Sequence, residues 1–594
     1  MQGRMLAVFC AVVLAVPAAA AADVPVSVGS NPSPFPQNKQ NEPAVAIDPL
    51  NTNIVLGGSN DEIDEPNCVG SSCPFVQGIG NTGVYWSTTG GSSWTQPNYH
   101  GYSARTGARG AQGPLGTGLI GTLPNYDTAG LVSDGDPAVA WGPAPGPNGF
   151  SWQNGERAYF ANLTANFSSV RSDEAFKGYE AIAVSHTVDL NAAMNGQNSG
   201  WSNPSIVSDT RQSSSTFSDK EAVWADDAAT SKYFGNVYVC WTDFRSATVT
   251  GNGNAPIMLS RSTDGGNSWS RGIQLTAAHN NASAGGRQGC DMRTDSTGVL
   301  DVFFTDSADK QEAIKLVRST DGGQTIGKAS VISYESNPGG PSVVRPGEND
   351  NIDGVAGSRT DDFPHVSIAN GAPSGAGAPD TISVAWNDGG SGLGDEHVYV
   401  KLSPDGTTWT PAQAIERGSD RPAMPSVALS PDGKDLYAVY NAFLDPFREH
   451  VGPVSVGQDA NSRLFETVAL HGNVSGTTLT MDSGELFRGD RGDARASSAN
   501  GLIDEFLGDY NQASATNNGA AMVYITANNA QQCQAIHDYR DSLVNAAEGS
   551  STPPLPAPAP CNGTKYGNTD IRGLAPSDPS ADGGASAGRA GKRG

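Results

Sequence analysis

Short runs of apolar residues, some continuous and some alternating with polar residues, recur along the whole chain, and turn-forming residues separate them. The runs are rich in β-branched and aromatic side chains, which is typical of β-strands. No long stretch keeps the period of an amphipathic helix, and the one short helix that we expect lies near 534–545. The 73 glycines and 38 prolines also suit short strands joined by turns. The sequence therefore predicts an all-β protein.

The predicted strands form pairs, and the pairs repeat. The first strand of each pair is expected at 41–47, 136–140, 220–224, 288–292, 363–368, 424–429 and, more loosely, 508–511. The second strand is expected at 54–58, 158–160, 237–241, 299–304, 382–386, 436–440 and 521–525. Repetition of this kind predicts a β-propeller of four-stranded antiparallel blades, with long insertions between strands. We favour seven blades; the count falls to six if the last pair only completes the first blade.

Four segments share a glycine-containing turn motif that follows a short apolar run. They read STTGGSSW at 87–94, STDGGNSW at 262–269, STDGGQTI at 319–326 and SPDGTTW at 403–409. Glycine permits positive φ, and the Asp is placed to accept N–H bonds within its own turn. The motif contains only one carboxylate, which does not suit a calcium loop. The four copies therefore indicate a folding device that belongs to the repeat unit.

These segments resemble the Asp-boxes (BNR repeats) of the β-propellers of the sialidase superfamily, and the resemblance covers most of the chain. It implies a sialidase-like glycoside hydrolase that acts on a glycan or polysaccharide. A sialidase would have three arginines that bind a substrate carboxylate, an Asp acid/base, and a Tyr nucleophile with a supporting Glu. The Arg-Ile-Pro motif that the family has ahead of the first box is absent, because the corresponding positions are Asn41-Glu42-Pro43.

The box positions indicate where a site would lie. In a four-stranded antiparallel blade, a box after the third strand shares a face with the turn between the first two strands. The starts of the first strands lie on the opposite face, and carboxylates gather there. Like charges raise one another's pKa and can keep an acid protonated near neutrality. The catalytic candidates on this face are Asp136, Glu221, Asp243, Asp362 and Tyr510, with Tyr510 and Glu221 as the nucleophile pair.

The substrate-binding candidates are mostly arginines, because a guanidinium group binds a carboxylate through two parallel hydrogen bonds. They are Arg245, Arg287, Arg421, Arg448 and His365. Two other functions fit the same pattern. A non-catalytic propeller that binds glycans or proteins would show shallow pockets between its blades. A polysaccharide lyase would use His365 or Tyr510 as its base.

The chain is expected to have three parts. Residues 1–22 are a predicted signal peptide, 23–545 are the propeller, and 546–594 are a Pro/Ala/Gly-rich tail that we expect to be disordered. The strand at 24–28 is expected to form the outermost strand of the last blade and so to close the ring. We expect a secreted, soluble monomer without a membrane-spanning segment.

Removal of the signal peptide leaves six of the seven cysteines, an even number in an oxidising compartment. We expect the disulfides 68–73, 240–290 and 533–561, although the sequence alone leaves every connectivity open. No cofactor is expected to be required, since no Cys/His set has zinc spacing. A structural calcium ion remains open, and the Asp-rich segment 348–362 is its candidate. The net charge of −25 disfavours nucleic acid and anionic membranes as partners.

Overall fold

The structure is a computed structural model of the whole chain. It describes residues 22–28, 40–65, 75–105, 112–208, 216–245, 255–276, 286–307, 312–336, 363–390, 394–446, 463–497, 506–527, 530, 533–547, 550–556 and 569–580. All structural statements below refer to these residues.

Seven antiparallel blades form a closed ring, because the first strand of each blade contacts the first strand of the next, and the last contacts the first. Blade 1 is β2 (Gln40–Ile47), β3 (Val55–Asp61) and β4 (Thr82–Ser87); blade 2 is β8 (Ala138–Pro143), β11 (Glu156–Asn166), β12 (Ala181–His186) and β13 (Ser205–Ile206). Blade 3 is β14 (Phe217–Ala225), β15 (Val237–Phe244), β16 (Ile257–Ser262) and β17 (Ile273–Gln274); blade 4 is β18 (Arg287–Thr294), β19 (Leu300–Asp306), β20 (Ala313–Ser319) and β21 (Ser330–Tyr334). Blade 5 is β22 (His365–Ile368), β23 (Ile382–Asp388), β24 (His397–Ser403) and β25 (Gln413–Ala414); blade 6 is β26 (Arg421–Leu429), β27 (Asp435–Phe443), β28 (Leu464–Ser475) and β29 (Thr478–Met481). Blade 7 is β32 (Gln512–Thr516), β33 (Gly519–Thr526), β34 (Asp570–Leu574) and β1 (Val24–Pro25). The predicted all-β propeller with seven blades is confirmed.

A few short elements decorate the blades. The hairpin β5 (Tyr99–Arg105) and β6 (Gln112–Ile120) lies between blades 1 and 2 in the chain, and β7 (Leu131–Ser133) pairs with β11. The remaining short strands are β9 (Pro145–Gly146), β10 (Gly149–Phe150), β30 (Phe487–Arg488) and β31 (Gly492–Asp493). Short 3-10 turns lie at Asp127–Ala129, Trp152–Asn154, Arg171–Asp173, Asn198–Gly200 and Ala494–Ala496. The α-helices are α1 (Leu190–Met194) and α2 (Gln534–Ala547), and α2 coincides with the predicted helix. None of the described helices is long and apolar enough to span a membrane.

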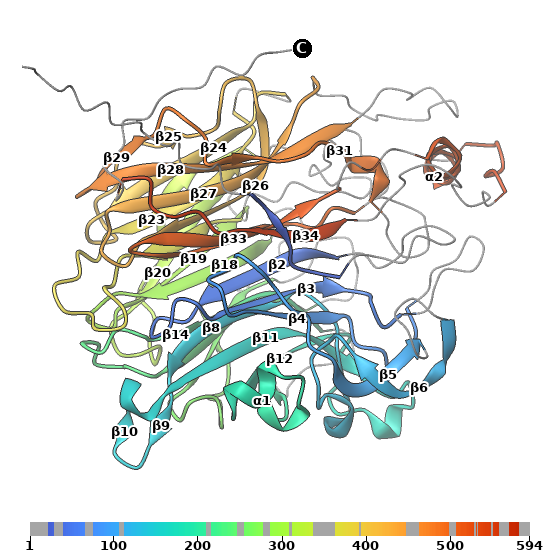
Figure 1. Cartoon of the computed structure of the whole chain (residues 1–594), viewed down its shortest axis with the longest axis horizontal. Helices are drawn as coiled ribbons and strands as arrows, with labels where there is room; N and C mark the ends of the chain where they lie inside the picture. Colours follow the sequence, from blue (N-terminus) through green and yellow to red (C-terminus); the bar gives the residue numbers. More distant parts are fainter. Residues whose placement is uncertain are drawn as a thin grey trace, which may run out of the picture.

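The two ends of the chain meet in blade 7. Val24 of β1 lies opposite Gly573 of β34, and Arg572 forms an ion pair with Asp23. In Figure 1 the blue strands β2 and β3 of blade 1 lie beside the red strands β33 and β34 of blade 7. The predicted closure by the strand at 24–28 is therefore confirmed. Strand β34 lies within the 546–594 segment, which was expected to be disordered. That expectation is wrong for residues 570–574, because the apolar side chains of Ile571 and Leu574 are buried in the closing blade.

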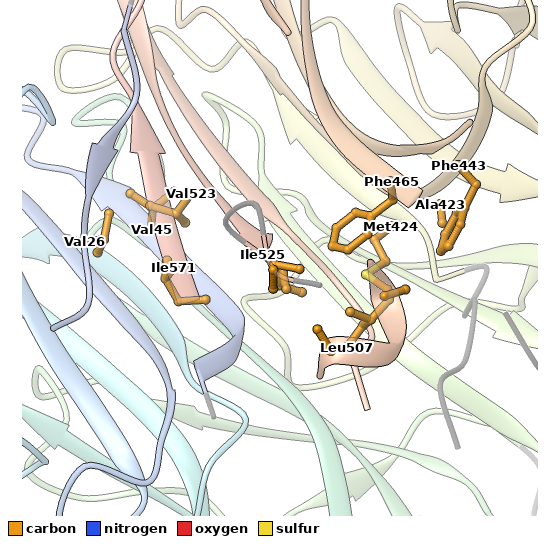
Figure 2. Packing of buried hydrophobic residues seen from close by; sticks show 14 of the residues in the cluster. Val26, Val45, Ala423, Met424, Phe443, Phe465, Leu507, Val523, Ile525 and Ile571 are labelled. Carbon is orange, nitrogen blue, oxygen red and sulfur yellow. The ribbon is translucent and has the colours of Figure 1, made fainter. Parts of the chain in front are cut away.

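Hydrophobic clusters fill the gaps between neighbouring blades. The cluster at the ring closure contains Val26, Val45, Val523 and Ile571, which come from both chain ends (Figure 2). The other gaps hold comparable clusters of Val, Ile, Leu, Ala and aromatic side chains. Because both faces of each blade are covered by neighbours, the strands are apolar on both sides, which explains their near-continuous hydrophobic runs.

The four motif segments, called the box turns below, follow the third strands β4, β16, β20 and β24. In the second box turn, Asp264 Oδ1 accepts a hydrogen bond from the Ser268 N–H at 2.9 Å, and Ser262 Oγ accepts one from the Gly266 N–H at 2.8 Å. The first box turn has Thr89 where the others have Asp, and the Thr89 hydroxyl lies 2.9 Å from Ser93 Oγ. The Thr89 hydroxyl thus replaces one of the hydrogen bonds that the Asp carboxylate forms in the second box turn, the bond with the serine hydroxyl four residues later.

The disulfide between Cys240 and Cys290 is present, as predicted, and joins β15 of blade 3 to β18 of blade 4. Cys533 is also in a disulfide, and its predicted partner Cys561 lies outside the described residues. The predicted pair 68–73 also lies outside them.

Candidate functional site

Four of the seven first strands contain a β-bulge near their start. The bulges lie in the β2–β3, β14–β15, β18–β19 and β26–β27 pairs. The bulges place Glu42, Lys220, Gly289 and Met424 at φ values of 52° to 61°. Asp136, just before β8, has φ 47°. Positive φ costs a non-glycine residue about 1–3 kcal/mol, so the surrounding contacts must stabilise it.

Lys220 lies at the centre of the resulting cluster. Its Nζ atom is 2.5 Å from Asp509 Oδ2, 3.1 Å from Asp136 Oδ2 and 3.5 Å from Glu42 Oε1. The acids come from blades 7, 2 and 1, so one ammonium group joins four blades. Glu42 and Asp509 are only 1% and 2% exposed. Below, the charge cluster means Glu42, Asp136, Lys220 and Asp509.

Backbone and amide groups hold the acids in place. Asn60 Nδ2 donates hydrogen bonds to Glu42 Oε2 at 2.6 Å and to Asp136 Oδ1 at 3.5 Å. The Asp509 N–H donates to Glu42 Oε1 at 3.1 Å. Gly508 has φ 96°, and a Cβ atom there would lie 2.9 Å from Asn41 Cβ. Glycine at 508 therefore allows the segment before β32 to approach β2 closely enough to form the cluster.

The cluster shifts the pKa values of its acids in opposite directions. Burial raises the pKa of Glu42, and the nearby charge of Asp136 raises it further. Burial also acts to raise the pKa of Asp136, but Lys220 and a hydrogen bond with Glu42 outweigh it and leave that pKa below its usual value. Burial acts to lower the pKa of Lys220, yet the three acids hold it well above the usual value. Asp136 is thus ionised beside a permanently charged ammonium group.

Glu221 and Tyr510 adjoin the charge cluster in the chain. Burial raises the pKa of Glu221 well above its usual value, with Asp136 as the next cause. Both Glu221 carboxylate oxygens are buried and accept no hydrogen bond from any described residue. The Lys220 Nζ atom lies 5.9 Å from the centre of the Tyr510 ring. Burial, followed by Asp136 and Glu42, raises the pKa of Tyr510, so its phenol is a neutral hydrogen-bond donor.

Three of the five predicted catalytic residues, Asp136, Glu221 and Tyr510, therefore come together. Asp243 instead accepts a hydrogen bond from Arg245 Nε at 2.9 Å near the end of β15. Asp362 lies outside the described residues. The charge cluster occupies the starts of the first strands, at the opposite end of the blades from the box turns.

The three predicted substrate-binding arginines among the described residues are each paired with a different acid. Arg245 pairs with Asp243, Arg287 with Asp306 at 3.1 Å, and Arg421 makes two 3.0 Å hydrogen bonds to Glu396. Their positive charges are thus balanced locally, so the expected three-arginine grip on a substrate carboxylate is not seen among the described residues. Arg448 lies outside them, as does the 348–362 segment considered for calcium.

His365 lies elsewhere, at the start of β22. The N–H of its neighbour Val366 donates to Asp291 Oδ2 at 2.8 Å. Burial lowers the pKa of His365 to about 4, and Arg293 also lowers it while Asp291 raises it. His365 is therefore neutral at pH 7.

A cavity of about 270 Å³ runs along the axis, and the first strands of all seven blades line it. It begins two or three residues beyond the charge cluster, at positions such as Val45, Ala138, Ala222 and Gln512. It extends to the turns after the first strands, at Pro49, Pro431 and Asn518. The charge cluster thus closes the end of the channel that faces away from the box turns.

Three residues of the charge cluster were not predicted as site residues, namely Glu42, Lys220 and Asp509. All three occur at the starts of first strands. One signal could have identified them. When the repeats are aligned on the apolar pairs Ala44-Val45, Ala138-Val139 and Ala222-Val223, the residues two positions earlier are Glu42, Asp136 and Lys220. A single Lys at the repeat position that holds acids in the two preceding blades predicts an ion pair across the axis.

Comparisons with known proteins give weak matches. No protein-family model matches the sequence, and no curated protein matches it. Among solved structures, a Trypanosoma rangeli sialidase in complex with the inhibitor DANA has 12% identity and a TM-score of 0.37 over 69% of this chain. The alignment spans about half (54%) of that sialidase. A Hadza microbial sialidase has 13% identity and a TM-score of 0.36, covering 85% of this chain and 92% of its own.

A further match is an α-L-arabinofuranosidase from Fusarium graminearum in complex with an iminosugar inhibitor. It has 12% identity and a TM-score of 0.36, covering 65% of this chain and 87% of its own. Likenesses this weak assign no activity to the chain, and the propeller fold rests on the strand pairing described above.

Proposed function

We propose that this chain is an exported glycoside hydrolase whose site lies at the charge cluster, and that it acts on uncharged glycans. The observation that carries the proposal is that Asp136 acts electrostatically on Glu221 from the neighbouring blade, while the pKa values of the two acids are shifted in opposite directions. Glycosidases use two carboxyl groups, one protonated and one ionised.

The two acids have separate roles in the proposal. Glu221, kept protonated by burial, donates its proton to the leaving glycosidic oxygen as the C–O bond breaks. Asp136, kept ionised by Lys220, either attacks the anomeric carbon or takes a proton from the water that attacks it. Tyr510 donates a hydrogen bond from its neutral phenol. The anomer of the first product, read by NMR, distinguishes attack by Asp136 from attack by water.

The charge of the site favours an uncharged substrate. The cluster holds three acids and one lysine, so its acidic groups outnumber its cation. An anionic sugar would meet this field without the three arginines that a sialidase uses. Neutral glycans avoid that repulsion.

The experiment is hydrolysis of a panel of neutral and sialylated oligosaccharides by the purified full chain. We expect sugar release from neutral members only. Glu221→Gln and Asp136→Asn should each lower kcat by at least about 100-fold, since general acid–base groups contribute about 10²–10⁴-fold. Asp243→Asn is the matched control, because Asp243 pairs with Arg245 outside the cluster, and it should retain activity. Equal loss in Asp243→Asn, or release of sialic acid alone, would contradict the proposal.

A second candidate function is binding without catalysis, in the axial cavity instead of the shallow pockets between blades that were expected for it. The Arg293 guanidinium lies 4.7 Å from the centre of the Trp224 ring, and both residues line the cavity with Asp227 and Asn370. An aromatic face beside polar groups suits a sugar ring. This function predicts glycan binding that Trp224→Ala abolishes and Glu221→Gln leaves intact, measured by calorimetry on the same panel.

A further inference from the structure

A set of buried polar side chains, Asp435, His471 and Asp578, lies between blades 6 and 7, away from the charge cluster. Asp435 and Tyr437 are two residues apart on β27 and so share one face of blade 6. Tyr437 lies directly opposite His471 of β28, with the two ring centres 5.1 Å apart. That face packs against blade 7, because Tyr437 shares a hydrophobic cluster with Met522, Tyr524 and Leu574. Asp578, which follows β34 in blade 7, completes the group.

The imidazole of His471 is fixed from one side and faces acids on the other. Its Nδ1 atom lies 2.8 Å from Asp482 Oδ2. Its Nε2 atom lies 3.3 Å from Asp435 Oδ1 and 4.0 Å from Asp578 Oδ1. In metal sites, a ligating His typically donates its other ring N–H to a carboxylate, which fixes the tautomer. Asp482 is in the position of that carboxylate.

The three ligand atoms lie close enough together to bind one metal ion after a small shift of Asp578. One oxygen of Asp435, one of Asp578 and one His471 nitrogen all lie within 4.8 Å of one another, and all three residues are buried. Two ligand atoms that each lie about 2.1 Å from a zinc ion at a tetrahedral angle are about 3.4 Å apart. The 3.3 Å separation of His471 Nε2 and Asp435 Oδ1 meets this value, and the 4.0 Å separation of Asp578 needs a shift of about half an ångström.

A second observation also points to a missing ligand. The Tyr437 side chain is fully buried, yet its hydroxyl has no hydrogen-bond partner among the described residues. The Tyr437 ring packs beside the imidazole of His471, with Asp435 two residues away on the same strand, so the phenol belongs to this group of side chains. An unsatisfied buried hydroxyl costs about 1–3 kcal/mol, and a metal ion or its bound water would satisfy it.

We propose that Asp435, His471 and Asp578 bind one Zn²⁺ ion between blades 6 and 7. An imidazole nitrogen with carboxylate oxygens suits zinc, whereas calcium and magnesium prefer oxygen ligands alone. Asp578 Oδ1 also accepts 2.7 Å hydrogen bonds from the Ser580 N–H and hydroxyl, which orient it. The ion links the closing blade to its neighbour and so acts as a clamp on the ring.

The test is zinc binding by the purified full chain after treatment with a chelator and gel filtration. We expect one Zn²⁺ per chain by calorimetry, and visible absorption bands when Co²⁺ replaces Zn²⁺. Asp578→Asn and His471→Gln should remove the zinc and the cobalt bands. Asp482→Asn should weaken zinc binding by about 10–100-fold, as expected for a residue that orients a ligand.

His397→Gln is the matched control. His397 Nδ1 lies 2.8 Å from Glu416 Oε1, so it reproduces the His471–Asp482 contact without a buried pair of acids at the other nitrogen. Its zinc content should equal that of the wild type. If His471→Gln does not fold, Asp578→Asn decides the result, with folding checked by circular dichroism. The proposal is overturned if the wild type binds no more zinc than Asp578→Asn, or if His397→Gln loses zinc to the same extent.

Discussion

The ammonium nitrogen of Lys220 lies 2.5 Å from Oδ2 of Asp509, and this ion pair connects blade 3 to blade 7 across the propeller axis. The same ammonium group contacts Asp136 and Glu42. One positive charge therefore offsets part of the repulsion among three buried acids. Four blades share it, so the charge cluster couples the position of each blade to the others.

Lys220→Met should destabilise the protein strongly at pH 7. It leaves three buried acids without their cation, and removal of one partner from a buried ion group typically costs about 3–5 kcal/mol. Urea unfolding gives the change in the free energy of unfolding. Lys434→Met is the control, because Lys434 pairs with Asp432 while its side chain is 73% exposed. That change should alter stability very little, and similar losses in the two variants would refute the expectation.

Glu221→Gln should raise stability at pH 8 while it lowers kcat of the proposed reaction by at least about 100-fold. The folded-state pKa of Glu221 is raised by burial, so the ionised form destabilises the fold as the pH rises through that pKa. Glutamine resembles the protonated acid, so the gain should shrink towards pH 4, where the wild-type carboxyl is protonated in both states. Thermal unfolding at the two pH values measures this, and a gain that is the same at both would contradict it.

The pH profile of the proposed hydrolysis should be bell-shaped. Activity needs Asp136 ionised and Glu221 protonated. Because the pKa of Asp136 is lowered and that of Glu221 is raised, the acid limb should fall below the usual Asp value of 3.8 and the alkaline limb well above the usual Glu value of 4.5. The profile of kcat/KM on a neutral oligosaccharide reports both limbs. An alkaline limb near pH 4.5 would remove Glu221 as the acid.

Loss of the Cys240–Cys290 disulfide should destabilise the protein by about 4 kcal/mol, because chain entropy lost on closing a loop of this length gives about that value. The two cysteines are 50 residues apart in the sequence and join neighbouring blades. The double change Cys240→Ser, Cys290→Ser is compared with the wild type by urea unfolding. A loss below about 1 kcal/mol would show that packing between blades 3 and 4 alone holds the two strands.

Asp264→Ala should cost about 1–2 kcal/mol, because it removes the acceptor for the Ser268 N–H and hydroxyl in the second box turn. Asp264→Thr should cost less, since Thr89 takes the Asp position in the first box turn and still contacts Ser93. Thermal unfolding ranks the variants. If threonine is no better than alanine, the Thr89 contact does not stabilise its turn.

The repeating parts of the molecule could be predicted from the sequence because each depends on local pattern. The alternation around Val45, Val223 and Val427 places those residues in first strands. The box turns follow the third strands, so their positions show that the first-strand starts lie at the opposite end of the blades. The Cys240–Cys290 pair followed from the expectation that neighbouring blades are adjacent. The short helix that was expected near 534–545 corresponds to α2 (Gln534–Ala547).

The site could be predicted only in part, because its geometry depends on contacts between distant residues. Asp136, Glu221 and Tyr510 were placed by repeat position alone, and they do converge. The role of Lys220 depends on positive φ at a bulge, which neither its residue type nor its neighbours reveal. The partners of the arginines could not be predicted for a related reason: Arg421 is paired with Glu396 of blade 5, 25 residues earlier, and no local pattern shows this.

The pairing of β1 with β34 sets an order of events during biosynthesis. Asp23 and Arg572, which pair across this contact, are 549 residues apart, so the first strand made must wait for almost the last. Until then, the side of blade 1 that carries Val45, Val55 and Tyr85 has no neighbour to cover it. A chain in which β34 has not yet been synthesised would therefore expose this apolar surface of blade 1 to solvent.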